Sequence, residues 1–369
     1  MNPRDRYLGC VRGEPVDRVP LTLEGLKYAT REALAEEPDA LKRDVAERIF
    51  DFTHYDHLHP APTNRCLVTP AQRMRVVGEE RRNGTVITTT EIDTPKGKLT
   101  AIRGRNATSN TSWHIKHPVE SLEDIEKIRS VPWERPPGLR APEPNRVPDG
   151  FEQRGIHRLG VSCPMVCVAG MMPRAFFLEL CITEPDLLLE LTEICLERIL
   201  DILEVVLSNG VVEYVWMGGS EWLTPPMASP ETYRALVQPQ EARIIARVHE
   251  AGAVCHVHCH GNVRAILDMV IARGADYFEP VEPPPDGDIT FAEAKERVAG
   301  RMTLGGNIEA RVLEKADVGT VAQAAYAAFE GRTERMVLRT SAGPICAFDE
   351  TMHRNYHRLI DVWEERCAL

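Results

Sequence analysis

The sequence lacks long apolar runs and long basic runs. No stretch of its 369 residues approaches the ~18 apolar residues that a membrane span needs, and residues 1–6 lack the apolar core of a signal peptide. Lysine and arginine total 44 against 55 aspartate and glutamate, a net charge of −11, and no basic run exceeds a pair. The resulting negative field repels polyanions, which argues against nucleic acid and membranes as partners. We therefore expect a cytoplasmic protein.

Several catalytic signatures are also missing. The sequence has no CxxC pair, which excludes zinc-ribbon and thioredoxin-like sites. It has no GxGxxG or GxxxxGK[ST] after a strand to cradle a phosphate, no GxSxG nucleophile elbow and no HExxH. Its ten cysteines do not indicate a disulfide framework in a cytoplasmic protein, so they are buried packing residues, metal ligands or redox groups.

The first 150 residues differ in composition and hydrophobic pattern from the rest. They are polar and proline-rich, and the Thr/Val/Ile alternation of residues 84–100, interrupted by Thr94-Pro95-Lys96-Gly97, predicts a β-hairpin. Prolines scattered through residues 131–149 predict a long connection without regular structure. We interpret this part as the insertion-bearing N-terminal portion of a single domain that spans residues 1–369.

From about residue 155 the sequence repeats one unit: a short apolar run, a turn rich in glycine or polar residues, and an amphipathic helix. The clearest helix is the Leu-rich run 187–207, and the strand candidates are residues 211–217, 253–257, 276–281, 302–305 and 336–338. Repeated βα units give an open parallel sheet or a closed barrel. Length and the polar residues that follow the strands favour a (β/α)8 TIM barrel with N-terminal β-hairpin elaborations. The helix over residues 352–365 has an apolar stripe that is expected to close the barrel.

The densest group of chemically versatile residues is Cys255-His256-Val257-His258-Cys259-His260. On a strand, alternate residues face the same way, so the three histidines face one side and the two cysteines the other. Imidazoles two residues apart at a strand end can bind one cation, and neutral imidazole is a common zinc ligand. We interpret His258 and His260 as metal ligands; a histidine-rich strand end with ordinary hydrogen bonds is the alternative.

Further ligands must come from other strand ends, because a barrel site gathers residues from several of them. The candidates are Glu221, Glu279, Glu282 and Cys346. Glu282 is placed at the exit of its strand and is a candidate for both metal binding and catalysis, as is Glu221. A solvated loop charge or a helix cap is the plain alternative for each carboxylate, and packing for Cys346.

Two glycine-rich strand exits add candidates of another kind. Gly218 and Gly219 follow an apolar strand, and they either allow a cofactor to approach the backbone closely or simply form a tight turn. Asn307, which follows Gly305-Gly306, either hydrogen-bonds a substrate as a catalytic residue or caps a helix.

Taken in order, these segments resemble the uroporphyrinogen decarboxylase superfamily, which also contains zinc-dependent methyltransferases that work with corrinoid proteins. The resemblance is carried by Arg4-Asp5-Arg6-Tyr7, Arg18-Val19-Pro20, Thr94-Pro95-Lys96-Gly97, Ser229-Pro230-Glu231-Thr232-Tyr233, His258-Cys259-His260-Gly261-Asn262, Gly274-Ala275-Asp276, Gly305-Gly306-Asn307-Ile308 and Ser341-Ala342-Gly343-Pro344. It implies a (β/α)8 barrel with its site at the C-terminal ends of the strands.

The resemblance also indicates which branch of the superfamily this sequence is closer to. The decarboxylases carry an arginine-rich loop after the opening Arg-Val-Pro, and residues 21–28 have no such loop. The methyltransferases hold zinc with His-x-Cys-Gly and a distant cysteine. In this sequence His258 matches the family histidine, His260 takes the place of the first cysteine, and Cys346 lies two residues out of register with the second.

The leading hypothesis is a zinc-dependent methyltransferase that moves a methyl group between a corrinoid, carried by a partner protein, and a small-molecule donor or acceptor. The alternatives are a metal-free decarboxylase of a tetrapyrrole or a smaller acid, and a corrinoid- or tetrapyrrole-binding module without chemistry. A homodimer is a weak expectation.

Overall fold

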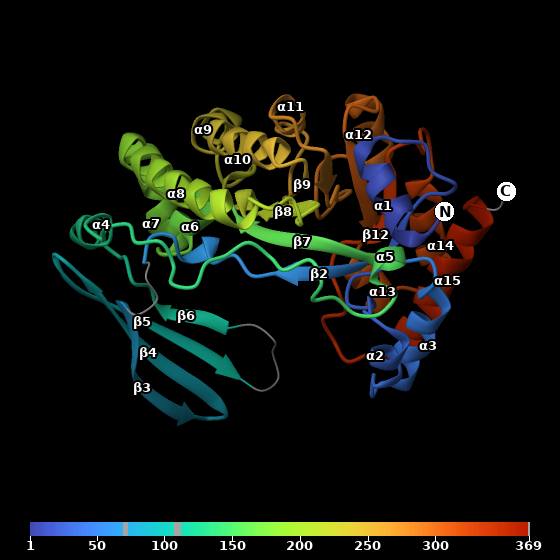
Figure 1. Ribbon diagram of the computed structural model, residues 1–369, viewed down its shortest axis with the longest axis horizontal. Helices are drawn as coiled ribbons and strands as arrows, with labels where there is room; N and C mark the ends of the chain where they lie inside the picture. Colours follow the sequence, from blue (N-terminus) through green and yellow to red (C-terminus); the bar gives the residue numbers. More distant parts are fainter. Residues whose placement is uncertain (69–72, 107–111, 368–369) are drawn as a thin grey trace.

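A curled, parallel, eight-stranded sheet forms the centre of the molecule. The computed structural model describes residues 1–68, 73–106 and 112–367. The sheet has the order β1-β12-β11-β10-β9-β8-β7-β2, and every neighbouring pair is parallel (Figure 1). Its strands are β1 (Leu21–Thr22), β2 (Tyr55–His59), β7 (Gly155–Ser162), β8 (Tyr214–Gly218), β9 (Val254–His258), β10 (Tyr277–Glu279), β11 (Thr303–Ile308) and β12 (Met336–Thr340).

The order of the strands is that of a TIM-like barrel, since consecutive strands of the chain are neighbours from β7 to β12. Among the described residues no backbone ladder joins the two edge strands, β1 and β2. A side-chain ion pair links the segments there, from Lys27 just after β1 to Asp56 of β2 at 2.6 Å. The predicted parallel α/β sheet is thus confirmed, and its closing seam consists of side chains.

Helices follow the strands and pack on the sheet's outer face. The longest, α8, begins at a proline in its first turn and buries one Leu- and Ile-rich face. The helices are α1 (Pro3–Arg12), α2 (Arg31–Ala35), α3 (Ala40–Ile49), α4 (Leu122–Arg129), α5 (Phe151–Arg154), α6 (Pro164–Ala169), α7 (Arg174–Thr183), α8 (Pro185–Val206), α9 (Pro230–Leu236), α10 (Gln238–Glu250), α11 (Leu267–Ala272), α12 (Phe291–Val298), α13 (Ala310–Lys315), α14 (Val318–Ala328) and α15 (Glu350–Cys367), with short 3-10 turns η1 (Thr63–Arg65) and η3 (Ser220–Leu223).

The sequence patterns located these elements well. The helix predicted over residues 187–207 is α8, and all five predicted strands coincide with β8 to β12 within a few residues. The C-terminal helix α15 buries its predicted stripe, Met352, Tyr356, Leu359, Ile360 and Trp363. Residues 131–149 contain neither helix nor strand, as their prolines predicted.

The predicted hairpin is part of a separate antiparallel sheet that lies beside the barrel (Figure 1). Its order is β3 (Met74–Arg82), β4 (Thr85–Thr94), β5 (Gly97–Asn106) and β6 (Ser112–Lys116). Asn83 and Gly84 both have positive φ, as the tight turn between β3 and β4 requires. Ile92 and Leu99 are buried in the main core, which anchors the sheet to the barrel.

No helix in the described part of the chain is long and apolar enough to cross a membrane.

Candidate functional site

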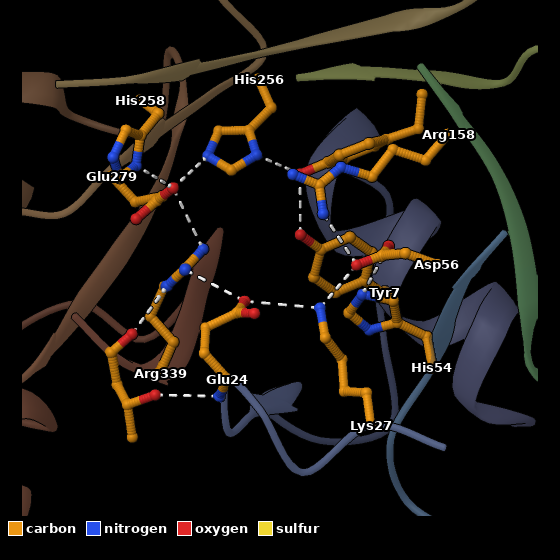
Figure 2. A network of polar contacts seen from close by, with 12 residues as sticks. Tyr7, Glu24, Lys27, His54, Asp56, Arg158, His256, His258, Glu279 and Arg339 are labelled. Carbon is orange, nitrogen blue, oxygen red and sulfur yellow. Dashed lines mark hydrogen bonds and ion pairs between the residues drawn. The ribbon is translucent and has the colours of Figure 1, made fainter. Parts of the chain in front are cut away.

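The interior of the curled sheet is lined by charged residues. Alternation along the strands turns Asp56, Arg158, His256, Glu279 and Arg339 toward the interior, whereas Cys255, Val257, Phe278 and Leu338 beside them are buried in the main core. Five strands contribute these side chains: β2, β7, β9, β10 and β12. The loop after β1 adds Glu24 and Lys27, so that three carboxylates and three cations come together (Figure 2).

One half of this charged ring is centred on Arg339. Its guanidinium lies 3.3 Å from Oε1 of Glu279 and donates to Oε1 of Glu24 at 3.1 Å. Glu24 in turn lies 3.4 Å from Nζ of Lys27. Burial alone would raise the pKa of Glu279, but the charge of Arg339 and the neighbouring histidines holds that pKa well below its usual range.

The other half is centred on Asp56. Its Oδ2 accepts from Lys27 at 2.6 Å and from Arg158 at 2.9 Å, and its Oδ1 lies 3.4 Å from Nε2 of His54. Burial opposes ionisation here as well, but the charges of Lys27 and Arg158 keep the pKa of Asp56 well below its usual range. The ring is therefore ionised and internally neutralised.

A line of polar contacts runs from α1 to the ring. The Tyr7 ring stacks on His54 at 3.7 Å, and its hydroxyl lies 2.8 Å from the hydroxyl of Tyr214. That hydroxyl lies 2.5 Å from Nδ1 of His256, whose Nε2 is 2.7 Å from Oε1 of Glu279. Burial lowers the pKa of His256 to about 4, so this imidazole is neutral at pH 7.

These residues surround a cavity of about 220 Å³. It is smaller than the roughly 300–1,000 Å³ of pockets for drug-sized ligands, so it suits a small molecule. Glu279 lines it, and its Oε2 is buried without a hydrogen-bond partner among the described residues. An unpaired buried acceptor is costly, which marks this carboxylate as an unusual group.

His258 and His260 lie at the C-terminal end of β9, next to this cavity. Nδ1 of His258 donates to Glu279 at 2.7 Å, and Nδ1 of His260 donates to Glu282 at 2.8 Å. The two rings are 4.6 Å apart and nearly perpendicular. As alternation predicted, His256 and His258 face the interior, while Cys255 and Cys259 are fully buried in the core on the other side.

The predicted carboxylates Glu282 and Glu221 differ in their hydrogen-bond partners. Glu282 accepts from His260 on one oxygen and from the backbone N–H of Gly261 on the other, so it holds the loop after β9. Oε2 of Glu221, in η3, is buried without a hydrogen-bond partner in the described chain. Burial would lower the pKa of His260, but the hydrogen bond to Glu282 and the charges of Glu282, Glu279 and Glu221 raise it.

Both predicted cofactor-binding glycines have packing roles. A Cβ on Gly218 would lie 2.6 Å from the Trp216 ring, and one on Gly219 would lie 2.4 Å from Cβ of Val166. Gly219 also has a φ of 119°, which L side chains rarely adopt. Protein packing and the tight turn therefore account for these two glycines; contact with a cofactor remains a prediction.

Asn307 and Cys346 lie apart from the two histidines' nitrogens. Asn307 donates to the carbonyl of Val281 and lies 3.4 Å from Glu309, so it connects β11 to the exit of β10. Cys346 is exposed, and its Sγ lies 3.8 Å from Glu314. In the described residues, no set of three ligand atoms that includes His258 and His260 comes within 4.8 Å of one another. The predicted metal shell is therefore not assembled around Cys346.

Sequence reasoning missed most of the charged ring. Glu24, Lys27, Asp56, Arg158 and Arg339 were not singled out, and Glu279 was only one of several candidate carboxylates. A signal existed at Arg339, since a charged residue directly extends the apolar run 336–338. Glu309 was also missed: burial, followed by the charge of Glu282, raises its pKa to about 7.

Comparison with known proteins identifies the family. The model of the uroporphyrinogen decarboxylase (URO-D) family matches residues 159–362, more than half of the chain. The chain belongs to the uroporphyrinogen decarboxylase family. The matched region of this family member begins in β7 and ends in α15, and it carries the rim of the site from β9 to β12.

A solved structure agrees on the fold. A methyltransferase from Methanosarcina mazei matches with a TM-score of 0.58 and 16% identity over 99% of both chains. A B12-independent methionine synthase from Shewanella sp. W3-18-1, in complex with selenomethionine, matches with a TM-score of 0.36 and 9% identity over 81% of this chain and 78% of that one, too low to establish a shared fold. No curated protein matches the sequence significantly.

Proposed function

We propose that this protein is a zinc-dependent methyltransferase that moves a methyl group between a corrinoid, carried by a partner protein, and a small molecule. The observation that carries the proposal is the pair His258 and His260 at the end of β9, each with Nδ1 held by a carboxylate, beside a small charged cavity. Family membership and the likeness in fold to the Methanosarcina mazei methyltransferase support it.

The donor set fits zinc. Histidine ligands of zinc commonly donate their second ring N–H to a carboxylate, as His258 does to Glu279 and His260 does to Glu282. This leaves Nε2 of each ring for a metal. The unpaired carboxylate oxygen of Glu221 is the natural third ligand, once its side chain turns toward the imidazoles. Cys346 is left out of this set because its thiol lies beside Glu314.

Zinc at this place would lower the pKa of a bound thiol or polarise a methoxy or amine group. The chain's own residues orient the two imidazoles and neutralise the charges around them. Glu279 and Glu282 hold the imidazoles in one tautomer. Glu309, with a pKa of about 7, can hold or release a proton near the rim at neutral pH.

The charged ring argues against the tetrapyrrole decarboxylase. A porphyrinogen carries many carboxylates and needs unpaired cations, but Lys27, Arg158 and Arg339 are each paired with carboxylates of the ring. The cavity of about 220 Å³ is also too small for a tetrapyrrole within it. Both observations favour a small substrate.

The test uses the purified full chain, with methylcobalamin as methyl donor and 2-mercaptoethanol as acceptor. We expect His258→Ala to lose one zinc equivalent by elemental analysis and to lower the rate of methyl transfer by at least about 100-fold. His353→Ala is the matched control, since His353 lies on α15 and pairs with Asp44. It should retain both zinc and rate.

Full methyl transfer in His258→Ala would reject the proposal. So would the absence of transfer by a wild-type protein that instead releases CO2 from uroporphyrinogen without bound metal. Binding of cobalamin without any turnover would also reject it, in favour of a non-catalytic module.

A further inference from the structure

Three histidines cluster on the face of β2 and β7 that points away from the charged ring. β2 and β7 are parallel neighbours in which His57 lies opposite His157. Asp56 and Arg158, one residue away on each strand, face the interior, so His57 and His157 face outward. His59, two residues after His57, lies on the same outer face.

The three imidazoles have the spacing of a metal site. One ring nitrogen from each lies within 4.8 Å of the other two. Nε2 of His59 lies 2.8 Å from Nδ1 of His157, with the rings 19° from parallel, and the His57 ring is perpendicular to that of His157. Nitrogens around a tetrahedral zinc lie about 3.3 Å apart, as bonds of 2.0–2.1 Å require, so side-chain shifts of about 1 Å are enough.

The surroundings hold the rings in place. The Tyr55 hydroxyl lies 3.4 Å from Nδ1 of His57. Phe151, from α5, packs against His157 at 4.6 Å and against His57 at 5.6 Å. His157 is buried.

A large cavity opens beside the cluster. Elsewhere the helix that follows a strand covers the outer face, but here the proline-rich connection 131–149 passes over β2 and β7 (Figure 1). A cavity of about 910 Å³ lies between them, lined by His57 and His59 on one side and by residues 136–143 with Arg146 on the other.

We propose that His57, His59 and His157 bind a divalent transition-metal ion of the zinc type, with a fourth position open to this cavity. Imidazole is a preferred ligand of such ions, and three histidines with one open position leave room for a water molecule or a small ligand. Arg140 and Arg146 line the same cavity and favour an anionic ligand. This inference does not depend on the methyltransferase proposal, which concerns the opposite face of the sheet.

A second group, Asp44 with His353 and His357, is less suited to a cation. The Arg48 guanidinium lies 3.1 Å from Nδ1 of His357, and its charge opposes that of a metal. Asp44 is also 58% exposed and already accepts from both imidazoles. It serves as the control site.

The experiment titrates the chelator-treated full-length His258→Ala variant, which lacks the inner histidine pair, with Co²⁺ and records the visible d–d absorption of a site with four ligands. We expect His59→Gln and His157→Gln each to weaken Co²⁺ binding at this site by at least about 100-fold. His353→Gln in the same background is the matched control, because it removes an imidazole of another cluster and should retain the band. His59 is partly exposed, so His59→Gln decides the matter if His157→Gln fails to fold, as judged by circular dichroism.

The proposal is overturned if the His258→Ala protein shows no such band, or if the band persists when His59→Gln is added. It is equally overturned if the band disappears only when His353→Gln is added, because the ion would then belong to that cluster. None of these outcomes tests methyl transfer, so this inference and the proposed function can fail separately.

Discussion

At the scale of single residues, Glu279 shows how a site is made from charges that no local pattern connects. One carboxylate oxygen lies 2.7 Å from His256, 2.7 Å from His258 and 3.3 Å from Arg339. A buried carboxylate without such partners would take up a proton. Its ionised state, and with it the orientation of His258, therefore depends on Arg339, which is 60 residues away in the chain.

Glu309 gives a prediction at the same scale. Its pKa is raised from 4.5 to about 7 in the folded protein, so between these values the unfolded chain binds fewer protons than the folded one. The wild type therefore loses stability as pH rises through this window. Glu309→Gln avoids that loss, and its stability relative to wild type should rise from pH 4.5 to 7 by on the order of 1 kcal/mol, after allowance for partial exposure.

Urea unfolding at several pH values measures this difference. Glu250→Gln is the control, because Glu250 is exposed and only pairs with Arg247 at 3.9 Å. A gain for Glu309→Gln that is the same at pH 4.5 and pH 8 would show that the carboxyl group is not titrating in this window.

At the scale of elements, the turn after β8 shows how backbone packing places a candidate ligand. Gly219 adopts a φ of 119° and lets α6 approach so closely that Val166 occupies the space of a side chain. This turn starts η3 and sets the position of Glu221. The two glycines were therefore correctly identified as special, but from the sequence a tight turn and a ligand contact looked alike.

Gly219→Ala should consequently destabilise the fold. The new Cβ would clash with Val166 and would also force an unfavourable φ. Gly252→Ala is the matched control, since Gly252 has a φ of 78° but nothing within 4 Å of its Cβ position. We expect about 1 kcal/mol of destabilisation for the control and at least ~2 kcal/mol more for Gly219→Ala in urea unfolding. Equal losses would mean that Val166 moves away without cost.

At the scale of the whole molecule, the seam between β1 and β2 distinguishes this barrel. No backbone ladder crosses it in the described part of the chain, and Lys27 connects the two sides through Glu24 and Asp56. Closure of the sheet and charge balance of the site thus depend on the same side chains.

Lys27→Met should loosen that seam. Asp56 would keep Arg158, but the link from Glu24 would be broken. We expect amide hydrogen exchange in residues 21–28 and 54–59 to become at least about tenfold faster, equivalent to ~1.4 kcal/mol of opening free energy, while β8 and β9 change little. Lys98→Met, which removes a pair with Glu91 from the antiparallel sheet, is the control. Unchanged exchange at the seam would show that backbone packing alone holds it.

Much of the architecture was predictable. The βα repeat, the five strands from β8 to β12, the hairpin and the buried stripe of α15 follow from periods of 2 and 3.6 residues and from turn residues, all of which are local. The inward orientation of His256 and His258 was predictable for the same reason, since they share one face of β9.

The sequence by itself determined the elements, the faces of the strands and the family, because these depend on neighbours within a few positions. Only the tertiary structure decided which charges meet: Glu24, Asp56, Arg158, Glu279 and Arg339 come from five different segments. Electrostatic pairing acts through space at 3 to 4 Å, and the curling of the sheet, not distance along the chain, sets those separations. The outer histidine cluster arises in the same way, from the register of β2 against β7.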